Sequence, residues 1–194
     1  EFGNRVGDPA WRSFKLDPAP VTDPTKFSSV TVLIHGFQPG LRTLGNNSLK
    51  DEGQWLFDLA KQIVKAGGGD PSTNILRYDK LSGGWLDRTE STNPVNGGPL
   101  VLIADWWREA DINDSGFSEA AADALFASMV KLNGNPSLSA KIFNSPLHFI
   151  AHSRGTVVAS ETLQRLGEYE NRVLSQQLGY RPLNIQLTTL DVHD

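Results

Sequence analysis

The sequence contains no cysteine and only one methionine among its 194 residues. Without cysteine, the chain has no disulfide, no thiolate nucleophile and no cysteine-ligated metal site. Because there are no disulfides to indicate it, the sequence does not show whether the protein works in an oxidising or a reducing compartment. The N-terminus begins Glu-Phe and lacks the basic and apolar pattern of a signal peptide. We expect a processed or cloned segment, and the localisation, secreted or cytoplasmic, stays unknown.

Clustered positive charge and long apolar runs are also missing. The formal net charge is -4 at pH 7, and the 18 Lys and Arg residues form no cluster that would neutralise a phosphate backbone. Nucleic acid is therefore not an expected partner. The longest apolar run, at residues 100–107, is interrupted by Asp105 and is far shorter than the ~20 residues that a membrane-spanning helix needs. No transmembrane segment is expected.

What is present is an alternation of strand and helix patterns after an irregular start. Residues 1–27 contain Pro9, Pro18, Pro20 and Pro24 and indicate a proline-rich lead-in, followed by a single domain over 28–194. Short apolar runs predict strands, and apolar residues that recur at helical spacing predict helices between these strands. The predicted strands are 30–34, 100–104, 147–151 and 185–190, with helices at 48–65, 121–130 and 155–166 and a hairpin within 74–86. This order predicts an α/β fold with a mostly parallel sheet flanked by helices, in which right-handed crossovers place the strand ending at Ala151 between those ending at Ile34 and Leu190.

One serine lies where a predicted strand runs directly into a predicted helix. In LHFIAHSRGTVVAS, Ser153 follows Ala151 and His152 and precedes Arg154 and Gly155. A serine on such a tight turn projects its hydroxyl from the sheet edge, and the residues two before and two after it must be small so that strand and helix can approach. Ala151 stands where the usual pattern has glycine and keeps this steric logic. A serine in an ordinary glycine-terminated turn is the alternative interpretation.

A second strand also ends in a turn of small residues. In VTVLIHGFQPG, His35, Gly36 and Phe37 follow the buried strand 30–34. Gly36 allows the backbone to turn inward. His35 is interpreted as a structural residue that hydrogen-bonds this loop, in preference to a general base. Together the two turns predict a pair of loops at one edge of the sheet.

The H-G-F loop and the A-H-S-R-G turn resemble the α/β-hydrolase superfamily, in particular its serine esterases and lipases. The resemblance covers about residues 28–192 and implies that Ser153 is the nucleophile. It also implies that the backbone amides of Phe37 and Arg154 form the oxyanion hole, supported by His35, Gly36, Ala151, His152 and Gly155. The late turn TTLDVHD implies that Asp191 is the triad acid, although Val192 replaces the usual proline. Asp105 is a second carboxylate that could serve as the acid. It precedes the serine, however, whereas the family's order is serine, acid, histidine, so we interpret Asp105 as a carboxylate that holds a loop.

The catalytic histidine is where the sequence departs from the family. The family supplies it from a loop after its last strand, beyond residue 194. His148 lies within a predicted strand and His152 within the serine turn, so His193 is the one reserve candidate on this chain. We expect truncation before the catalytic histidine, with the base on a missing segment or a separate chain.

These observations predict a serine hydrolase that cleaves carboxylic esters, with a small-molecule or lipid ester as substrate and no cofactor. A peptidase or thioesterase would use the same machinery, and a catalytically silent fragment with a binding or scaffolding role is the alternative from another class. No metal site is expected: the acidic stretch at 111–116 begins like a calcium loop, but Ala122 stands where such loops need a glutamate. The last strand, 185–190, is expected to be an exposed edge, covered either by a second molecule, which would be self-association, or by the proline-rich lead-in.

Overall fold

The computed structural model describes residues 25–36, 54–79, 83–86, 94, 97–106, 110, 116–138 and 140–191. Over these ranges the chain forms one six-stranded sheet in the order β3-β2-β4-β1-β5-β6. The strands are β1 (Ser29–Ile34), β2 (Ile75–Asp79), β3 (Gly84–Leu86), β4 (Pro99–Ala104), β5 (Leu147–His152) and β6 (Ile185–Leu190). All neighbouring strands are parallel except β2 and β3. The predicted α/β class is confirmed, and β5 lies between β1 and β6 as expected.

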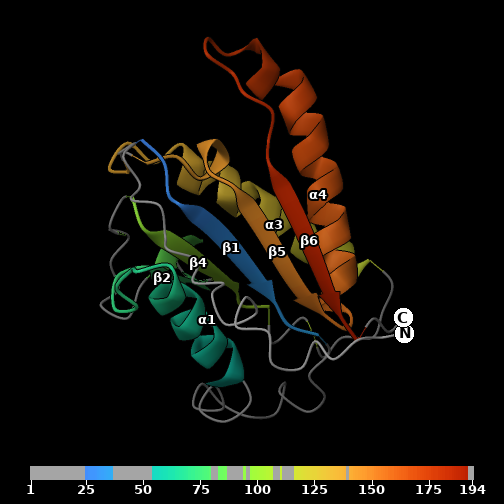
Figure 1. Cartoon of the computed structure of the whole chain (residues 1–194). Coiled ribbons are helices and arrows are strands. Elements are labelled where there is room, and N and C mark those ends of the chain that lie inside the picture. Colours follow the sequence, from blue (N-terminus) through green and yellow to red (C-terminus); the bar gives the residue numbers. More distant parts are fainter. Residues whose placement is uncertain are drawn as a thin grey trace, which may run out of the picture.

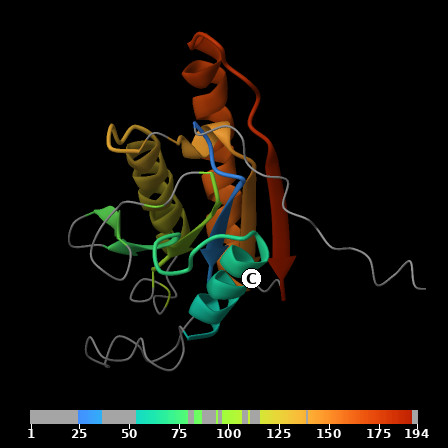
Figure 2. The same cartoon turned by 60° about the vertical axis from the view of Figure 1, so that its left-hand side comes forward.

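Helices cover both faces of the sheet. The helix α1 (Gln54–Ala66) lies on one face, and α3 (Phe117–Asn133) and α4 (Gly155–Arg172) lie on the other (Figures 1 and 2). Short 3-10 turns, η3 (Ile142–Asn144) and η4 (Leu174–Gln176), precede β5 and follow α4. Among the described residues, no helix is long and apolar enough to cross a membrane.

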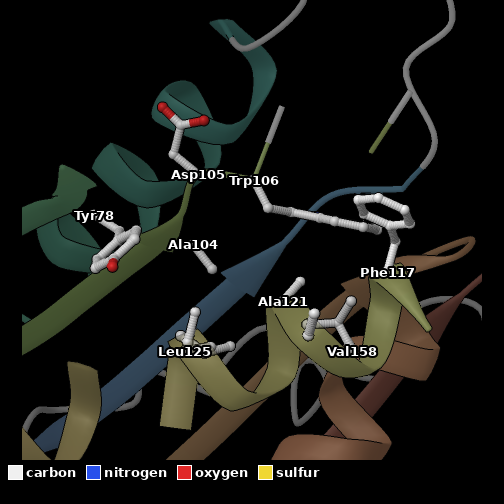
Figure 3. A pocket seen from close by; sticks show the side chains of 10 residues that line it. Tyr78, Ala104, Asp105, Trp106, Phe117, Ala121, Leu125 and Val158 are labelled. Carbon is white, nitrogen blue, oxygen red and sulfur yellow. The ribbon is translucent and has the colours of Figure 1, made fainter. Parts of the chain in front are cut away.

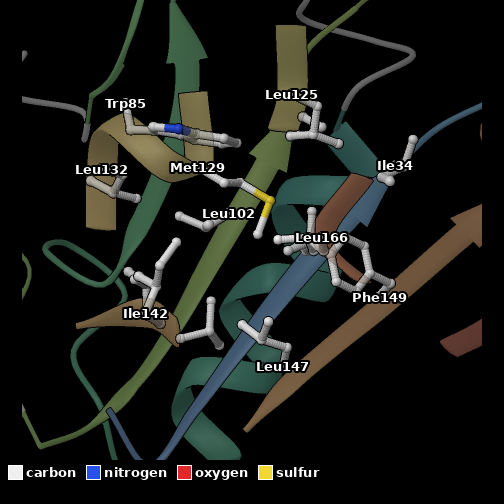
Figure 4. Packing of buried hydrophobic residues seen from close by; sticks show 14 of the residues in the cluster. Ile34, Trp85, Leu102, Leu125, Met129, Leu132, Ile142, Leu147, Phe149 and Leu166 are labelled. Atoms are coloured by element: carbon white, nitrogen blue, oxygen red, sulfur yellow. The ribbon is translucent and has the colours of Figure 1, made fainter. Parts of the chain in front are cut away.

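The apolar residues of the central strands divide between two cores because successive side chains of a strand point to opposite faces. On β1, Val32 and Ile34 join the larger core beneath α3 and α4, whereas Leu33 joins the smaller core beneath α1. Figure 4 shows the larger core, where Met129 of α3 and Leu166 of α4 meet side chains from the sheet. The strands β1 and β4 are buried on both faces, which explains their unbroken apolar sequences.

The hairpin predicted within 74–86 is present, since β2 and β3 pair in antiparallel register. The strand β2 also pairs in parallel with β4, with Ile75 opposite Val101. This second pairing was not predicted, because a short apolar segment beside a turn does not indicate which other strand it will join. The hairpin therefore extends the main sheet by two strands.

The helix α4 continues to Arg172, beyond its predicted end at residue 166. Gly167 favours termination, but Tyr169, two residues later, packs edge-on against Phe126 of α3, with ring centroids 5.8 Å apart. This tertiary contact outweighs the local preference of one glycine. The carboxylate of Glu170 then accepts hydrogen bonds from the Tyr180 hydroxyl at 2.6 Å and from the Leu183 amide at 2.7 Å. The extended helix thus anchors the segment that returns to β6.

The last strand forms one edge of the sheet, and its only neighbour among the described strands is β5. Most of its side chains are exposed, including Leu187 at 41% and Leu190 at 42%. The predicted exposed edge is therefore present. Of the predicted proline-rich lead-in, 1–27, which is the other expected cover of this edge, residues 1–24 lie outside the described residues.

Replacing Phe149 by alanine should lower the free energy of unfolding by about 3–5 kcal/mol, because this fully buried ring lies in the larger core and its loss leaves a cavity. Urea denaturation followed by circular dichroism measures the change. The matched control is Leu178→Ala, since Leu178 is fully exposed and its truncation should stay within about 0.5 kcal/mol. Equal effects of the two substitutions would contradict this account of the core.

Candidate active site

Ser153 lies in the turn between β5 and α4, at the carboxyl edge of the sheet. Its φ is 51°, and among the described non-glycine residues only Asp191 shares a positive φ. The left-handed conformation is unfavourable for a residue with a Cβ, so the turn is strained in the way that the sequence predicted. The Ser153 amide donates to the Leu190 carbonyl at 2.9 Å, and the Ser153 carbonyl accepts from the Thr156 amide at 2.9 Å. These two bonds hold the strained residue between β6 and the first turn of α4.

Two glycines allow the backbone to approach this serine. A Cβ built on Gly36 would lie 2.6 Å from Ser153 Cβ and 3.1 Å from Ser153 Oγ, closer than side chains tolerate. A Cβ built on Gly155 would lie 2.5 Å from the carbonyl oxygen of His35. The H-G turn after β1 and the start of α4 therefore meet at the serine, and each contact requires a residue without a side chain.

The remaining residues of the serine turn lie on opposite sides of β5. Ala151 is fully buried in the larger core and pairs in register with Ile34 of β1. The His152 ring points the other way and contacts Trp55 of α1 edge-on, with centroids 6.0 Å apart. Arg154 has helical φ and ψ at the start of α4. The first amides of a helix have no acceptor within it and carry partial positive charge, so this helix end favours a developing oxyanion.

His35 is completely buried and is part of a compact set of contacts. Its Nδ1 donates to the carbonyl of Gly36 at 2.8 Å, and its ring stacks on Trp106, with centroids 5.6 Å apart. The Trp106 indole nitrogen donates to the carbonyl of His35 at 2.9 Å. The structure thus gives His35 the loop-holding contacts that were expected of it.

The two candidate acids end different strands. Asp191 follows β6, the neighbour of β5, and comes directly after Leu190, whose carbonyl binds the Ser153 amide. Asp105 follows β4, which is separated from β5 by β1, and lies 3.8 Å from the Arg77 guanidinium. The topology therefore brings Asp191 to the strand next to the serine turn, whereas Asp105 lies at the same edge of the sheet but two strands from β5, beside Arg77 of β2.

Phe37, Val192 and His193 lie outside the described residues. One expected oxyanion donor and the reserve base are thus not placed. Residues 111–115 of the acidic stretch also lie outside them, and α3 begins at Phe117, after Gly116, without a side-chain capping bond. Over the residues that are described, no cluster of His, Asp or Glu side chains suits a metal ion.

A pocket of about 240 Å³ lies beside Trp106, between the ends of β2 and β4 and the first turns of α3 (Figure 3). Its walls are mostly apolar and include Tyr78, Phe117, Leu125 and Val158, with Asp105 as the one carboxylate in the lining. This pocket was not predicted from the sequence. The feature of the sequence that indicates it is the alanine-rich start of α3, where Ala120, Ala121 and Ala124 line the space, because small side chains on a helix leave room against a sheet.

Comparisons with known proteins do not assign the chain to a family. No protein-family model, no curated protein and no solved structure matches the sequence or the fold. The functional argument therefore depends on the residues and on their geometry alone.

His148 provides a pH-dependent test of the strand packing beside the site. Its Nε2 lies 2.9 Å from the Thr188 hydroxyl oxygen, and burial lowers the pKa of the ring below its ordinary value of 6.5. The unfolded chain therefore binds the proton more readily, so the stabilising contribution is complete above the ordinary pKa of 6.5 and is lost as the pH falls from there through the lowered pKa of the folded state. Unfolding by urea between about pH 7.5 and 5 should show a greater loss of stability in the wild type than in His148→Gln. Equal losses would contradict the prediction.

Proposed function

We propose that the chain is a serine hydrolase of the esterase or lipase type, which cleaves carboxylic esters through an acyl-enzyme on Ser153. The observation that carries the proposal is the position of this serine, with a φ of 51° between β5 and α4 and with Gly36 packed against its hydroxyl side. A strained serine at a strand-to-helix turn at the carboxyl edge of a parallel sheet is the arrangement that exposes a nucleophile.

In this mechanism, Ser153 Oγ forms a bond to the ester carbonyl carbon while its proton passes to a histidine base. The carbonyl oxygen becomes an oxyanion, which the amides of Arg154 and Phe37 would bind, each donor being worth about 3–4 kcal/mol. The C–O bond to the alcohol then breaks, and the alcohol leaves with the proton held by the base. Water attacks the acyl-enzyme by the same route and releases the carboxylic acid.

Asp191 is the proposed acid, which holds the imidazole in the correct tautomer. Its support is topological, because Asp191 ends the strand next to β5 and its neighbour Leu190 binds the Ser153 amide. The base is a histidine that the described residues do not place at Ser153, and His193 is the candidate on this chain.

The apolar pocket beside Trp106 supports an ester with an apolar acyl or alkyl group. The residues that line it are mainly apolar. The pocket is connected to the serine through Trp106, which donates a hydrogen bond to the His35 carbonyl, and through Gly36, which follows His35 and packs against Ser153. Burial of such a group stabilises the complex by about 0.8 kcal/mol for each methylene removed from water. The substrate class proposed is therefore a small-molecule or lipid ester.

Hydrolysis of p-nitrophenyl esters tests the proposal directly. The 194-residue chain should release nitrophenol faster than buffer, and Ser153→Ala should abolish the excess because it removes the nucleophile. Asp191→Asn should reduce the rate on the order of 10²–10⁴-fold, whereas Asp105→Asn, the matched change of the competing carboxylate, should have a much smaller effect.

A rate that is the same for the wild type and Ser153→Ala would overturn the proposed activity and favour a silent fragment with a binding role. His193→Ala separates the two sources of the base. Loss of activity in this variant would assign the base to His193, whereas full activity would exclude His193. Because the part of the chain described here places no other base, full activity would also count against the triad mechanism.

We also propose that two copies of the chain associate through β6. The strand has no neighbour on its outer side among the described strands, and Leu187 and Leu190 are exposed there. Backbone groups along an edge strand can pair with a strand of another chain. The β6 strand of a second copy is a suitable partner, because it has the same length and the same exposed apolar residues.

Size-exclusion chromatography with light scattering should show a concentration-dependent dimer for the wild type. Leu187→Lys should shift the chain to monomer, because a charge at an edge strand opposes pairing. The control Leu178→Lys adds the same charge at an exposed residue outside any strand and should leave the dimer intact. A wild-type monomer at all concentrations would contradict the association.

A further inference from the structure

Trp106 makes contacts that the proposed mechanism does not use. It follows β4, is 5% exposed, and is two strands away from Ser153 in the order of the sheet. We propose that Trp106 is a positioning residue for the reaction of Ser153, which acts by holding the His35–Gly36 turn at the serine. This inference rests on the proposed function, because it assigns a role in forming the oxyanion hole.

Two hydrogen bonds fix the peptide groups on either side of Gly36. The Trp106 indole donates to the carbonyl of His35 at 2.9 Å, and this carbonyl belongs to the peptide group before the Gly36 Cα. His35 Nδ1 donates to the carbonyl of Gly36 at 2.8 Å, which belongs to the peptide group after it. Since each peptide group is planar, a bond to its carbonyl also sets the direction of its amide. The amide that follows Gly36 is the one that the sequence assigns to the oxyanion hole.

Gly36 needs such restraint because of its own chemistry. The contact with Ser153 admits no Cβ, so the position requires glycine, which has more backbone freedom than any other residue. A freely rotating turn would present its amide to the oxyanion only part of the time. Fixing both adjacent peptide groups removes that freedom before the substrate binds, which is the preorganisation that electrostatic catalysis needs.

The carbonyl of His35 also packs against the start of α4. It lies 2.5 Å from the position of a Cβ on Gly155, so the first residue of α4 packs directly against it. Trp106 is itself anchored, since its own carbonyl accepts from the Ala110 amide at 2.8 Å. The indole therefore sets the spacing between the H-G turn and the helix end that carries the Arg154 amide.

The informative substitution is Trp106→Phe, which removes the indole donor but keeps an aromatic ring to stack on His35 and line the pocket. The matched control is Trp85→Phe, because Trp85 is a buried tryptophan of the same core, 2% exposed, whose ring packs against Tyr78. With p-nitrophenyl esters, Trp106→Phe should lower kcat by about tenfold or more and leave KM close to the wild-type value. Trp85→Phe should leave both constants near wild type.

A second measurement does not depend on activity. Long-range proton–nitrogen NMR of the full chain should show His35 protonated at Nδ1, since this atom faces a carbonyl that can only accept. The Nδ1 proton should exchange with solvent about tenfold faster in Trp106→Phe than in the wild type, and Trp85→Phe should not change it. A His35 protonated only at Nε2, or an exchange rate unchanged by Trp106→Phe, would overturn the proposal.

If Trp106→Phe does not fold, as judged by its melting curve, two substitutions at His35 test the same turn. His35→Asn keeps a nitrogen donor near the place of Nδ1 and should retain most of kcat, whereas His35→Phe keeps a ring without a donor and should lose it. Equal kcat values for these two variants would overturn the positioning role.

The outcomes separate this inference from the function on which it rests. Hydrolysis that Ser153→Ala abolishes and Trp106→Phe leaves unchanged would overturn the positioning role alone. A wild type no faster than Ser153→Ala would overturn the proposed function and, with it, the catalytic role of Trp106. A fall in kcat accompanied by faster exchange at His35 would support both.

Discussion

The candidate site depends on the close approach of three backbone segments at the end of β1. Gly36 packs against Ser153, and Gly155 packs against the carbonyl of His35, so the turn after β1, the turn after β5 and the start of α4 share one small volume. Parallel pairing of β1 and β5 brings the two turns to the same edge, and the missing side chains allow them to touch. Any side chain at either glycine would separate the segments, and the strained serine would lose its support.

Much of this arrangement follows from the sequence because it is set by local chemistry. Apolar β-branched runs indicate the central strands, and the small residues around Ser153 indicate a turn too tight for larger side chains. The position of β5 between β1 and β6 was predicted from right-handed crossovers between strands that alternate with helices. The sequence predicts that His35 hydrogen-bonds its own loop. It does not predict that the Gly36 carbonyl is the acceptor, since an imidazole in a loop has several carbonyls within reach.

The features that were not predicted all depend on contacts between distant residues. The length of α4 is decided by Tyr169 against Phe126, which no helical pattern near Gly167 reveals. The pairing of β2 with β4 is decided by which edge of the sheet is open when the hairpin docks. The pocket and the Trp106 contact require side chains from β4, β1 and α3 to meet, and the sequence specifies each of these only separately.

Glu170 has a consequence for the position of Asp191, which lies twenty-one residues later. Its carboxylate binds Tyr180 and Leu183, just before β6, while the other end of β6 is tied by the bond from Ser153 to Leu190. A slip of one residue between these two attachments would turn every side chain of β6 to the opposite face of the sheet. One carboxylate of α4, far from the carboxyl edge, therefore fixes the register of the last strand and so determines which of its residues lies beside Ser153.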